Sequence, residues 1–302
     1  MIRLTTQEIR NAVTTALPEG RVVAAHTDKE HFYKVDENTY PSVTAKLACL
    51  KDPSLTNFKM NEALRYVFAH FGEFTAENIM HHLAEAEKMP SDIFEDAGDI
   101  GTEIHNIRET YFSNWIKLGR TPTVKAVSSI PLDTGIQDTR IVSAMRALDK
   151  FIDDYRYEPV ATELKLYSHK LKIGGTLDDI GWMHLPVRPG SADCVHDFIG
   201  NGCAKCDYKV KRVLALVDLK SSNQTKFYFA YQVAMYYAMW KELTGIKLDK
   251  FYILRVSKTD GTYALQEIYR MPRIVKYAKH VLRVDEGNEI IKESFKKPTF
   301  KI

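Results

Sequence analysis

The segment 212–220, which reads RVLALVDLK, is the feature that most constrains the fold of this chain. It is apolar at five consecutive positions in its middle, a pattern typical of a central strand that is covered on both faces of a sheet. The strand ends in Asp218 and Lys220, whose side chains project together because residues two apart in a strand share a face. A covered strand of this kind predicts an α/β fold with helices on both sides of the sheet.

The neighbouring segments predict the other elements of that fold. Residues 160–167 alternate as a strand should, and residues 171–180 read as the hairpin partner of that strand. Further strands are expected near 251–256 and 263–268, with helices over about 97–118, 138–155, 226–243 and 273–283. The sequence therefore predicts a mixed central β-sheet flanked by helices.

The N-terminal third of the chain has a different pattern. Its first 60 residues mix turn signals with short β-like runs at 21–25 and 31–35, and we expect a small hairpin extension there. Helical spacing follows over 61–89, with a second helix beginning at Thr75. We therefore divide the chain into an N-terminal hairpin and helical extension, residues 1–96, and a core, residues 97–302.

Composition restricts the class of protein. The 302 residues are 45% hydrophobic and 27% charged, which is the balance of a folded globular chain. The net charge is only +3, so affinity for nucleic acid must come from local basic patches. The first residues lack the apolar run of a signal peptide, and the apolar stretch 227–240 is shorter than the roughly 18 residues that span a bilayer. Together with only four cysteines, this predicts a cytoplasmic protein without membrane contacts.

Two acidic strand ends indicate the chemistry. Asp178 ends one expected strand and Asp218 ends another, and two carboxylates that converge repel each other unless a cation lies between them. Oxygen ligands of this kind suit Mg²⁺ or Mn²⁺. Lys220 beside such a cation could position a water or neutralise charge on a phosphoryl group.

These residues resemble the motifs of the PD-(D/E)XK nuclease superfamily, and more narrowly of its RecB-like branch, which includes phage recombination exonucleases. The resemblance covers residues 98–240 and depends on the order of the motifs rather than on any single one. The motifs are GTEIH at 101–105, GTLD at 175–178, DLK at 218–220 and QVAMY at 232–236, with YPSVT at 40–44 similar to an opening common in phage members.

The resemblance implies a restriction-endonuclease-like core and a metal-dependent DNA exonuclease that hydrolyses phosphodiester bonds, in phage-type recombination or repair. One or two Mg²⁺ or Mn²⁺ ions would be held by His105, Asp178, Asp218 and the carbonyl of Leu219, while Lys220 positions water. The residues expected to take part in catalysis are Lys220, Asp178, Asp218, Gln232, Tyr236 and Glu163.

Several of these residues also have structural interpretations. His105 lies among apolar neighbours and could be a satisfied core histidine. Glu163 could hold the lysine or a water, or it could be solvated on its strand. Gln232 and Tyr236 share a helix face at positions i and i+4, either toward the site or as a buried polar pair. Asp179 is expected to point away from Asp178 and to be structural.

The chain departs from the family in the length between its acidic motifs. Asp178 and Asp218 are 40 residues apart, which indicates an insert over about 183–211. This insert contains a C-x-H and a C-x-x-C motif, which could close a tetrahedral zinc site or be free thiols with a solvated histidine. The four candidate zinc ligands are Cys194, His196, Cys203 and Cys206.

Two other functions are kept as alternatives. The first is an endonuclease or junction resolvase of the same superfamily, and the second is a DNA-binding module without catalysis. The expected partner is DNA, and a single-strand annealing protein and a homo-oligomer are considered on the basis of the resemblance. If the chain is phage-encoded, the expected location is the host cytoplasm.

Overall fold

The computed structural model describes residues 4–26, 31–50, 54–121, 126–136, 138–188 and 209–295. Its central element is a five-stranded sheet in the order β4-β5-β6-β7-β8. The pair β6–β7 is parallel and the other pairs are antiparallel, so the predicted mixed sheet is confirmed. The strands are β4 (Glu158–Ser168), β5 (Ile173–Arg188), β6 (Lys209–Lys220), β7 (Lys250–Val256) and β8 (Tyr263–Glu267).

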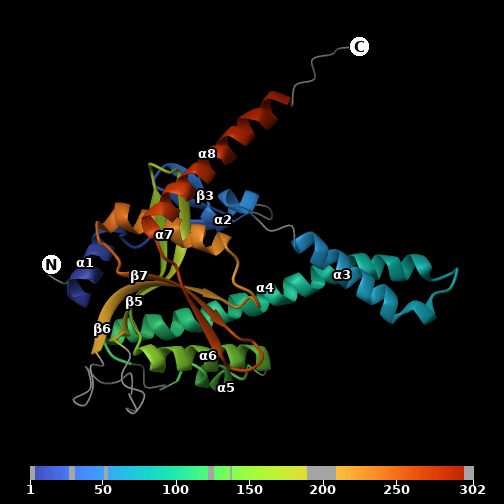
Figure 1. Ribbon diagram of the computed structural model, residues 1–302, viewed down its shortest axis with the longest axis horizontal. Coiled ribbons are helices and arrows are strands. Elements are labelled where there is room, and N and C mark those ends of the chain that lie inside the picture. The colour runs from blue at the N-terminus through green and yellow to red at the C-terminus, as the bar shows by residue number, and fades with distance from the viewer. Residues whose placement is uncertain are drawn as a thin grey trace.

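Helices cover both faces of this sheet (Figure 1). One face packs against α4 (Ile79–Leu118) and α6 (Thr139–Tyr155), and the other packs against α7 (Tyr228–Thr244), α1 (Thr6–Ala16) and α8 (Met271–Phe295). The strand β6 divides its side chains between the two cores, with Val213, Ala215 and Val217 in one and Leu214 and Leu216 in the other. This division explains why the strand reads as a continuous apolar run.

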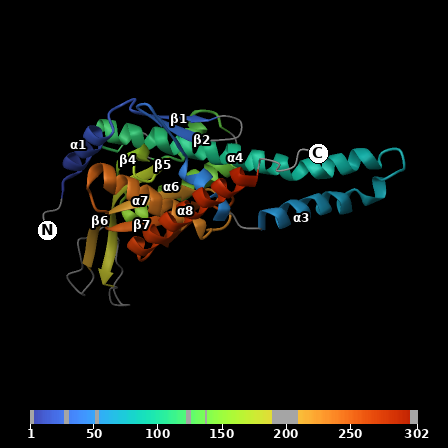
Figure 2. The same cartoon turned by 90° about the horizontal axis from the view of Figure 1, so that it is seen from above.

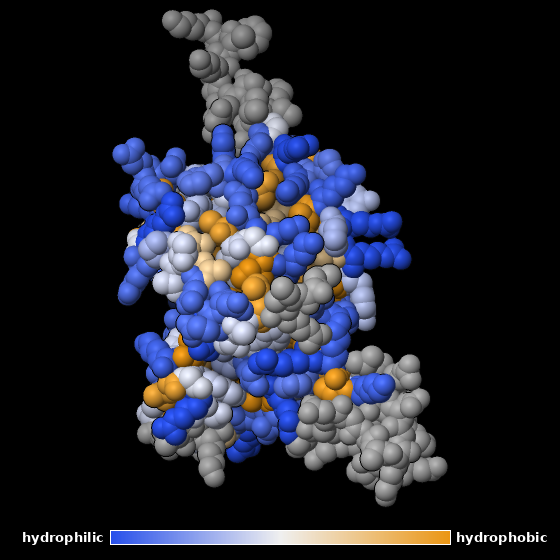
Figure 3. Space-filling view, turned by 90° about the vertical axis from the view of Figure 1, so that its left-hand side faces the viewer, coloured by the Kyte–Doolittle hydropathy of each residue, from blue (hydrophilic) through white to orange (hydrophobic). Residues whose placement is uncertain are grey.

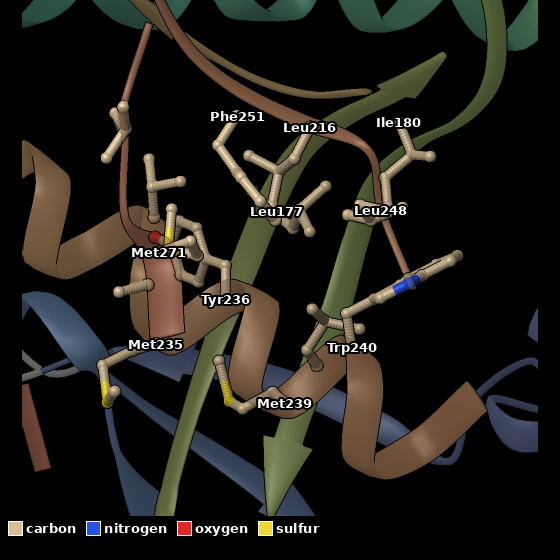
Figure 4. Packing of buried hydrophobic residues seen from close by; sticks show 14 of the residues in the cluster. Leu177, Ile180, Leu216, Met235, Tyr236, Met239, Trp240, Leu248, Phe251 and Met271 are labelled. Atoms are coloured by element: carbon tan, nitrogen blue, oxygen red, sulfur yellow. The ribbon is translucent and has the colours of Figure 1, made fainter. Parts of the chain in front are cut away.

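The core under α7 is built from side chains of several elements. Figure 4 shows Leu177 of β5 and Leu216 of β6 facing Tyr236 and Trp240 of α7. The helix α7 connects β6 to the parallel strand β7. It is apolar around most of its circumference because it is buried in the core on this face of the sheet. The tyrosine expected to line the site is thus part of a packed helix.

The N-terminal region is a three-stranded sheet rather than the expected hairpin. Its strands are β1 (Val22–His26), β2 (His31–Val35) and β3 (Asn38–Pro41), followed by the short helix α2 (Val43–Lys46). The helix α1, which the β-like reading of this region missed, begins with a capping box between Thr5 and Glu8. Its Ile9 is fully buried in the main core, so this region packs on the core domain.

The helices between the two sheets differ from the expected pattern. The helix α3 (Ser54–Ala69) is followed by the short η2 (Phe71–Glu73) and by α4, which is a single helix of 40 residues. The expectation of separate helices before and after residue 96 was wrong, because α4 continues through Pro90, which removes one backbone hydrogen bond and normally marks a helix end. The boundary expected between residues 96 and 97 falls inside this helix.

Two short helices, η1 (Ala48–Leu50) and α5 (Ser129–Asp133), complete the described elements. The edges of the expected insert at 183–211 are strand, since β5 reaches Arg188 and β6 begins at Lys209. The candidate zinc ligands Cys194, His196, Cys203 and Cys206 lie outside the described residues.

None of the helices in the described ranges combines the length and the apolar character needed to cross a bilayer. Figure 3 shows the end of the molecule opposite to the projecting α3 and first half of α4. The surface there is mostly hydrophilic, with apolar side chains in scattered patches. The region formed by α3 and α4 has a different surface, described below.

Two glycine substitutions test this packing with opposite expected signs. A Cβ on Gly181 would overlap the ring of Tyr157, whereas a Cβ on Gly98, in α4, meets no atom within 4 Å outside its own helix. We expect Gly181→Ala to destabilise the fold by about 1–3 kcal/mol because the buried ring must move. Gly98→Ala should be neutral or stabilise by up to about 1 kcal/mol because alanine favours the helix. Urea unfolding measures both; equal effects would contradict the packing described.

Candidate metal centre

Three carboxylates lie in one row across neighbouring strands. The register pairs Thr162 with Asp179 and Leu164 with Leu177, which sets Glu163 opposite Asp178. The next pair, Asp179 with Val217, sets Asp178 beside Asp218. Residues opposite each other in antiparallel strands have neighbouring side chains. Local strand pairing is therefore what concentrates the negative charge.

The backbone is irregular at this row. Leu177 and Ile180 both belong to the core under α7, although residues three apart in a regular strand face opposite ways. Opposite this point, Glu163 has a φ of +47°, in the left-handed region that an L residue rarely adopts. Such a conformation costs about 1–3 kcal/mol and persists only where the surrounding structure enforces it. The irregularity directs Glu163, Asp178 and Asp179 toward α4.

His105 of α4 completes a group of metal-ligating side chains. Its Nδ1 lies 3.6 Å from Oδ1 of Asp178 and 3.8 Å from Oε1 of Glu163. One ligand atom from each of these three residues lies within 4.8 Å of the others. Asp178 is buried, while His105 and Glu163 are partly exposed, so the group is open on one side. His105, Glu163 and Asp178 could therefore hold a metal ion.

Arg108, one helical turn after His105, is a fully buried cation behind this group. It contacts the carboxylate of Glu163, and its Nη1 lies 3.0 Å from Oδ2 of Asp179 and 3.6 Å from Oδ2 of Asp178. Burial by itself would lower the pKa of Arg108, but attraction by these three carboxylates raises it. The guanidinium is thus a permanent positive charge that compensates the acidic row.

Asp179 shares this arginine with Asp178, which differs from the expectation that it points away from its neighbour. It accepts hydrogen bonds from Nη1 of Arg108 at 3.0 Å and from the hydroxyl of Thr162 at 2.7 Å. Burial raises the pKa of Asp179 to about 7, against the opposing effect of Arg108. Its contacts with Arg108 and Thr162 give Asp179 the structural role that was expected.

Asp178 and Asp218 have different environments. The amide N–H of Leu219 donates to Oδ2 of Asp178 at 2.7 Å. Although burial opposes it, the nearby charges of His105, Arg108 and Lys220 lower the pKa of Asp178. Burial raises the pKa of Asp218 to about 6, although Lys220 opposes that shift. Asp178 is accordingly the better anionic ligand of the two.

Lys220 pairs with Asp218 as their spacing predicts. Its Nζ lies 2.7 Å from Oδ2 of Asp218 and 5.2 Å from the ring centroid of Phe229. The Asp218 side chain is only 1% exposed, and neither of its oxygens makes a hydrogen bond of good geometry with any described residue. The Lys220 ammonium is therefore the cation that compensates this buried carboxylate at Oδ2, and Oδ1 has no partner among the described residues.

Gln232 and Tyr236 form a buried pair on α7, where Nε2 of Gln232 donates to the hydroxyl of Tyr236 at 2.8 Å. The ring of Tyr236 lies against Gly175, at a point where a Cβ would be 2.6 Å from the ring. Burial, and then the negative charge of Asp218, raise the pKa of Tyr236. The structure thus shows the buried polar pair, and a role of the two residues toward the site stays a prediction.

The donor set fits a divalent cation. The combination of one imidazole and two carboxylates is one that divalent ions such as Mn²⁺ accept. Asp218, which was expected among the ligands, is not a member of this group and pairs with Lys220 instead, whereas Glu163 belongs to it. The backbone of Leu219 is tied to Asp178 through its N–H, and a role for its carbonyl remains a prediction.

The structure brings together His105, Asp178, Asp218, Lys220 and Glu163, and it adds Arg108, which the sequence analysis missed. The spacing of three residues after His105 was the available signal, because it puts both side chains on one helix face.

No protein-family model matches the chain, and no curated protein matches it.

Removing the buried cation should be costly. We expect Arg108→Met to destabilise the protein by about 3–5 kcal/mol, because it leaves three carboxylates without their compensating charge. Arg140→Met is the control, since Arg140 is partly exposed and pairs with Asp96 and Asp138 at the surface, where such pairs contribute at most about 1 kcal/mol. Urea unfolding with a chelator present measures both. Similar losses in the two variants would contradict the role assigned to Arg108.

Metal binding can be measured without any substrate. We expect calorimetry to detect Mn²⁺ binding to the wild type, and His105→Ala to weaken it by at least about tenfold because one of three ligands is lost. His81→Ala, at an exposed histidine of α4 outside the group, is the matched control. Equal affinities in all three proteins would show that the ion binds elsewhere.

Proposed function

We propose that the protein is a metal-dependent deoxyribonuclease that hydrolyses phosphodiester bonds, acting as an exonuclease in phage-type recombination or repair. The observation that supports this function is the meeting of His105, Asp178, Asp218 and Lys220, which are spread over more than a hundred positions of the sequence. The order of the motifs that carry these residues is the second support.

In this function His105, Glu163 and Asp178 would hold Mg²⁺ or Mn²⁺, with Asp218 beside them. When bound, such a cation supplies positive charge to phosphate oxygens and lowers the pKa of a water. The carboxylates keep their positions without it, because Arg108 and the N–H of Leu219 hold them from behind. The chain thus prepares the ligand geometry before any ion binds.

Lys220 acts as a fixed positive charge. Although burial opposes it, Asp218 and Asp178 raise the pKa of Lys220, so the ammonium stays protonated at neutral pH. An ammonium group donates hydrogen bonds to phosphoryl oxygens and stabilises the negative charge that develops on them during attack. Asp218 holds the ammonium in place through the 2.7 Å contact.

Gln232 and Tyr236 would orient the groups around the acidic row. The Tyr236 hydroxyl remains a hydrogen-bond donor because burial raises its pKa, and it is fixed by Gln232. In the reaction, a water oxygen forms a bond to phosphorus while the bond from phosphorus to the leaving oxygen breaks. The attacking water gives up one proton and the leaving oxygen takes one up, so that one strand end carries a phosphate and the other a hydroxyl.

Digestion of linear DNA with added Mn²⁺ tests this function. We expect the wild type to degrade DNA and Lys220→Ala to be slower by about 10²-fold or more, because the charge that stabilises the phosphoryl oxygens is lost. Lys241→Ala, at the exposed end of α7, should retain the wild-type rate. Equal digestion by wild type and Lys220→Ala would remove the proposal.

Closed circular DNA distinguishes the modes of cleavage, since an enzyme that requires ends leaves circles intact while an endonuclease opens them. A filter assay covers the non-catalytic alternative. Retention of DNA without metal, unchanged in Asp218→Ala and without any cleavage, would favour a DNA-binding module.

A further inference from the structure

The two helices at 54–96 form an arm that extends from the body of the protein (Figures 1 and 2). We define the arm as α3, η2 and the first half of α4. The two helices pack on each other. The ring centroids of Phe58 and Phe94 are 5.1 Å apart, and the Tyr66 hydroxyl forms a hydrogen bond of 3.2 Å with Nδ1 of His82. Of the arm side chains whose burial is described, only Ala86 and Pro90 are buried. A helical hairpin with so little core gains little stability from its own packing.

The arm exposes an unusual amount of apolar surface. Among the described residues, fifteen large apolar side chains are exposed, and eight of them are in the arm. Along α4 the side chains of Met80, Leu83, Glu87 and Phe94 follow each other at helical spacing on one face, with exposures of 74% for Met80 and 45% for Leu83. We call this face of α4, together with the other exposed apolar side chains of the arm, the arm surface. Apolar side chains that gather in one exposed region are typical of surfaces that bind a partner.

Charge indicates what kind of partner covers it. Residues 54–96 contain eight acidic and three basic side chains, a net charge of −5, although the whole chain carries +3. Glu87 lies within the arm surface, and Glu95 is exposed beside Phe94. Two arms would therefore repel each other, and nucleic acid would be repelled as well. The complementary partner is a helix that is basic and partly apolar.

The helix α8 of this same chain presents such a surface. Residues 269–284 contain five basic side chains and no acidic one, and the acidic residues of α8 begin after them at Asp285, which pairs with Lys46. On α8, Tyr277 and Val284 are exposed at 59% and 61%, and Lys276 and Arg283 are exposed beside them on the same face. The opposite face of the helix, with Ala278 and Leu282, is buried in the main core. We call the exposed face the α8 surface.

The two surfaces do not meet within one molecule, because the arm and α8 leave the body in different directions (Figure 1). We propose that the arm surface of one copy docks on the α8 surface of a second copy, so that the protein assembles head to tail. The apolar side chains would be buried between the helices, and the acidic and basic side chains would fix orientation. Because the two surfaces differ, the contact either closes into a ring or continues as a chain of molecules.

Charge reversal on each surface tests the assembly by analytical ultracentrifugation. We expect the wild type to form species that are multiples of 34.6 kDa, and to dissociate as salt rises from about 0.05 to about 0.5 M because the charges are screened. Lys276→Glu with Arg283→Glu, and separately Glu87→Lys with Glu95→Lys, should each weaken association by about tenfold or more. Lys241→Glu, on neither surface, should assemble as the wild type does.

Mixing the two charge-reversed proteins gives the decisive result. In an alternating assembly of the two, every arm surface meets an α8 surface of opposite charge, so we expect association to return. A wild type that stays at 34.6 kDa, an assembly that both variants retain, or a mixture that fails to associate would each overturn the proposal. Loss of DNA retention on Lys276→Glu with Arg283→Glu, without any change in mass, would also overturn it and assign the α8 surface to nucleic acid.

Discussion

The fully buried guanidinium of Arg108 is the interaction on which the acidic centre depends. Glu163, Asp178 and Asp179 approach one another closely, and so many carboxylates at the middle of a sheet would repel each other and lose hydration. A buried charge that is paired on several sides is tolerated, whereas the same group without its partners is strongly destabilising. Arg108 therefore allows the acids to remain close while their other sides stay available to His105 and Lys220.

The helix α4 connects this centre with the rest of the molecule. Its second half carries His105 and Arg108 against the sheet, and its first half forms the arm. The two halves of α4 thus differ, because the second half is buried by packing on the sheet while the first half exposes apolar side chains. The continuity through Pro90 means that the last part of the expected extension and the beginning of the expected core belong to one helix. The charge distribution follows the same division, since the arm is acidic while the exposed face of α8 is basic.

Much of the fold could be predicted from local patterns because those patterns directly record burial. Five apolar residues before Asp218 indicate a strand covered on both faces, and β6 divides them between two cores. The helix α1 and the third N-terminal strand were missed because both are short and their patterns compete with turn signals. The helix α4 was divided because the apolar spacing was assigned to separate segments at 61–89 and 97–118, whereas in the structure one helix continues through Pro90.

The sequence by itself determined that His105, Asp178, Asp218 and Lys220 are chemically suited to one site, and the order of the elements that carry them. Asp218 and Lys220 had to project together, since the period of a strand is two. Tertiary structure alone decided that Glu163 joins His105 and Asp178, and that Arg108 supports them. The reason is that strand register and a left-handed backbone residue set these contacts, and both depend on distant segments folding together. Local spacing contains no record of which side chains from other elements will face a given residue.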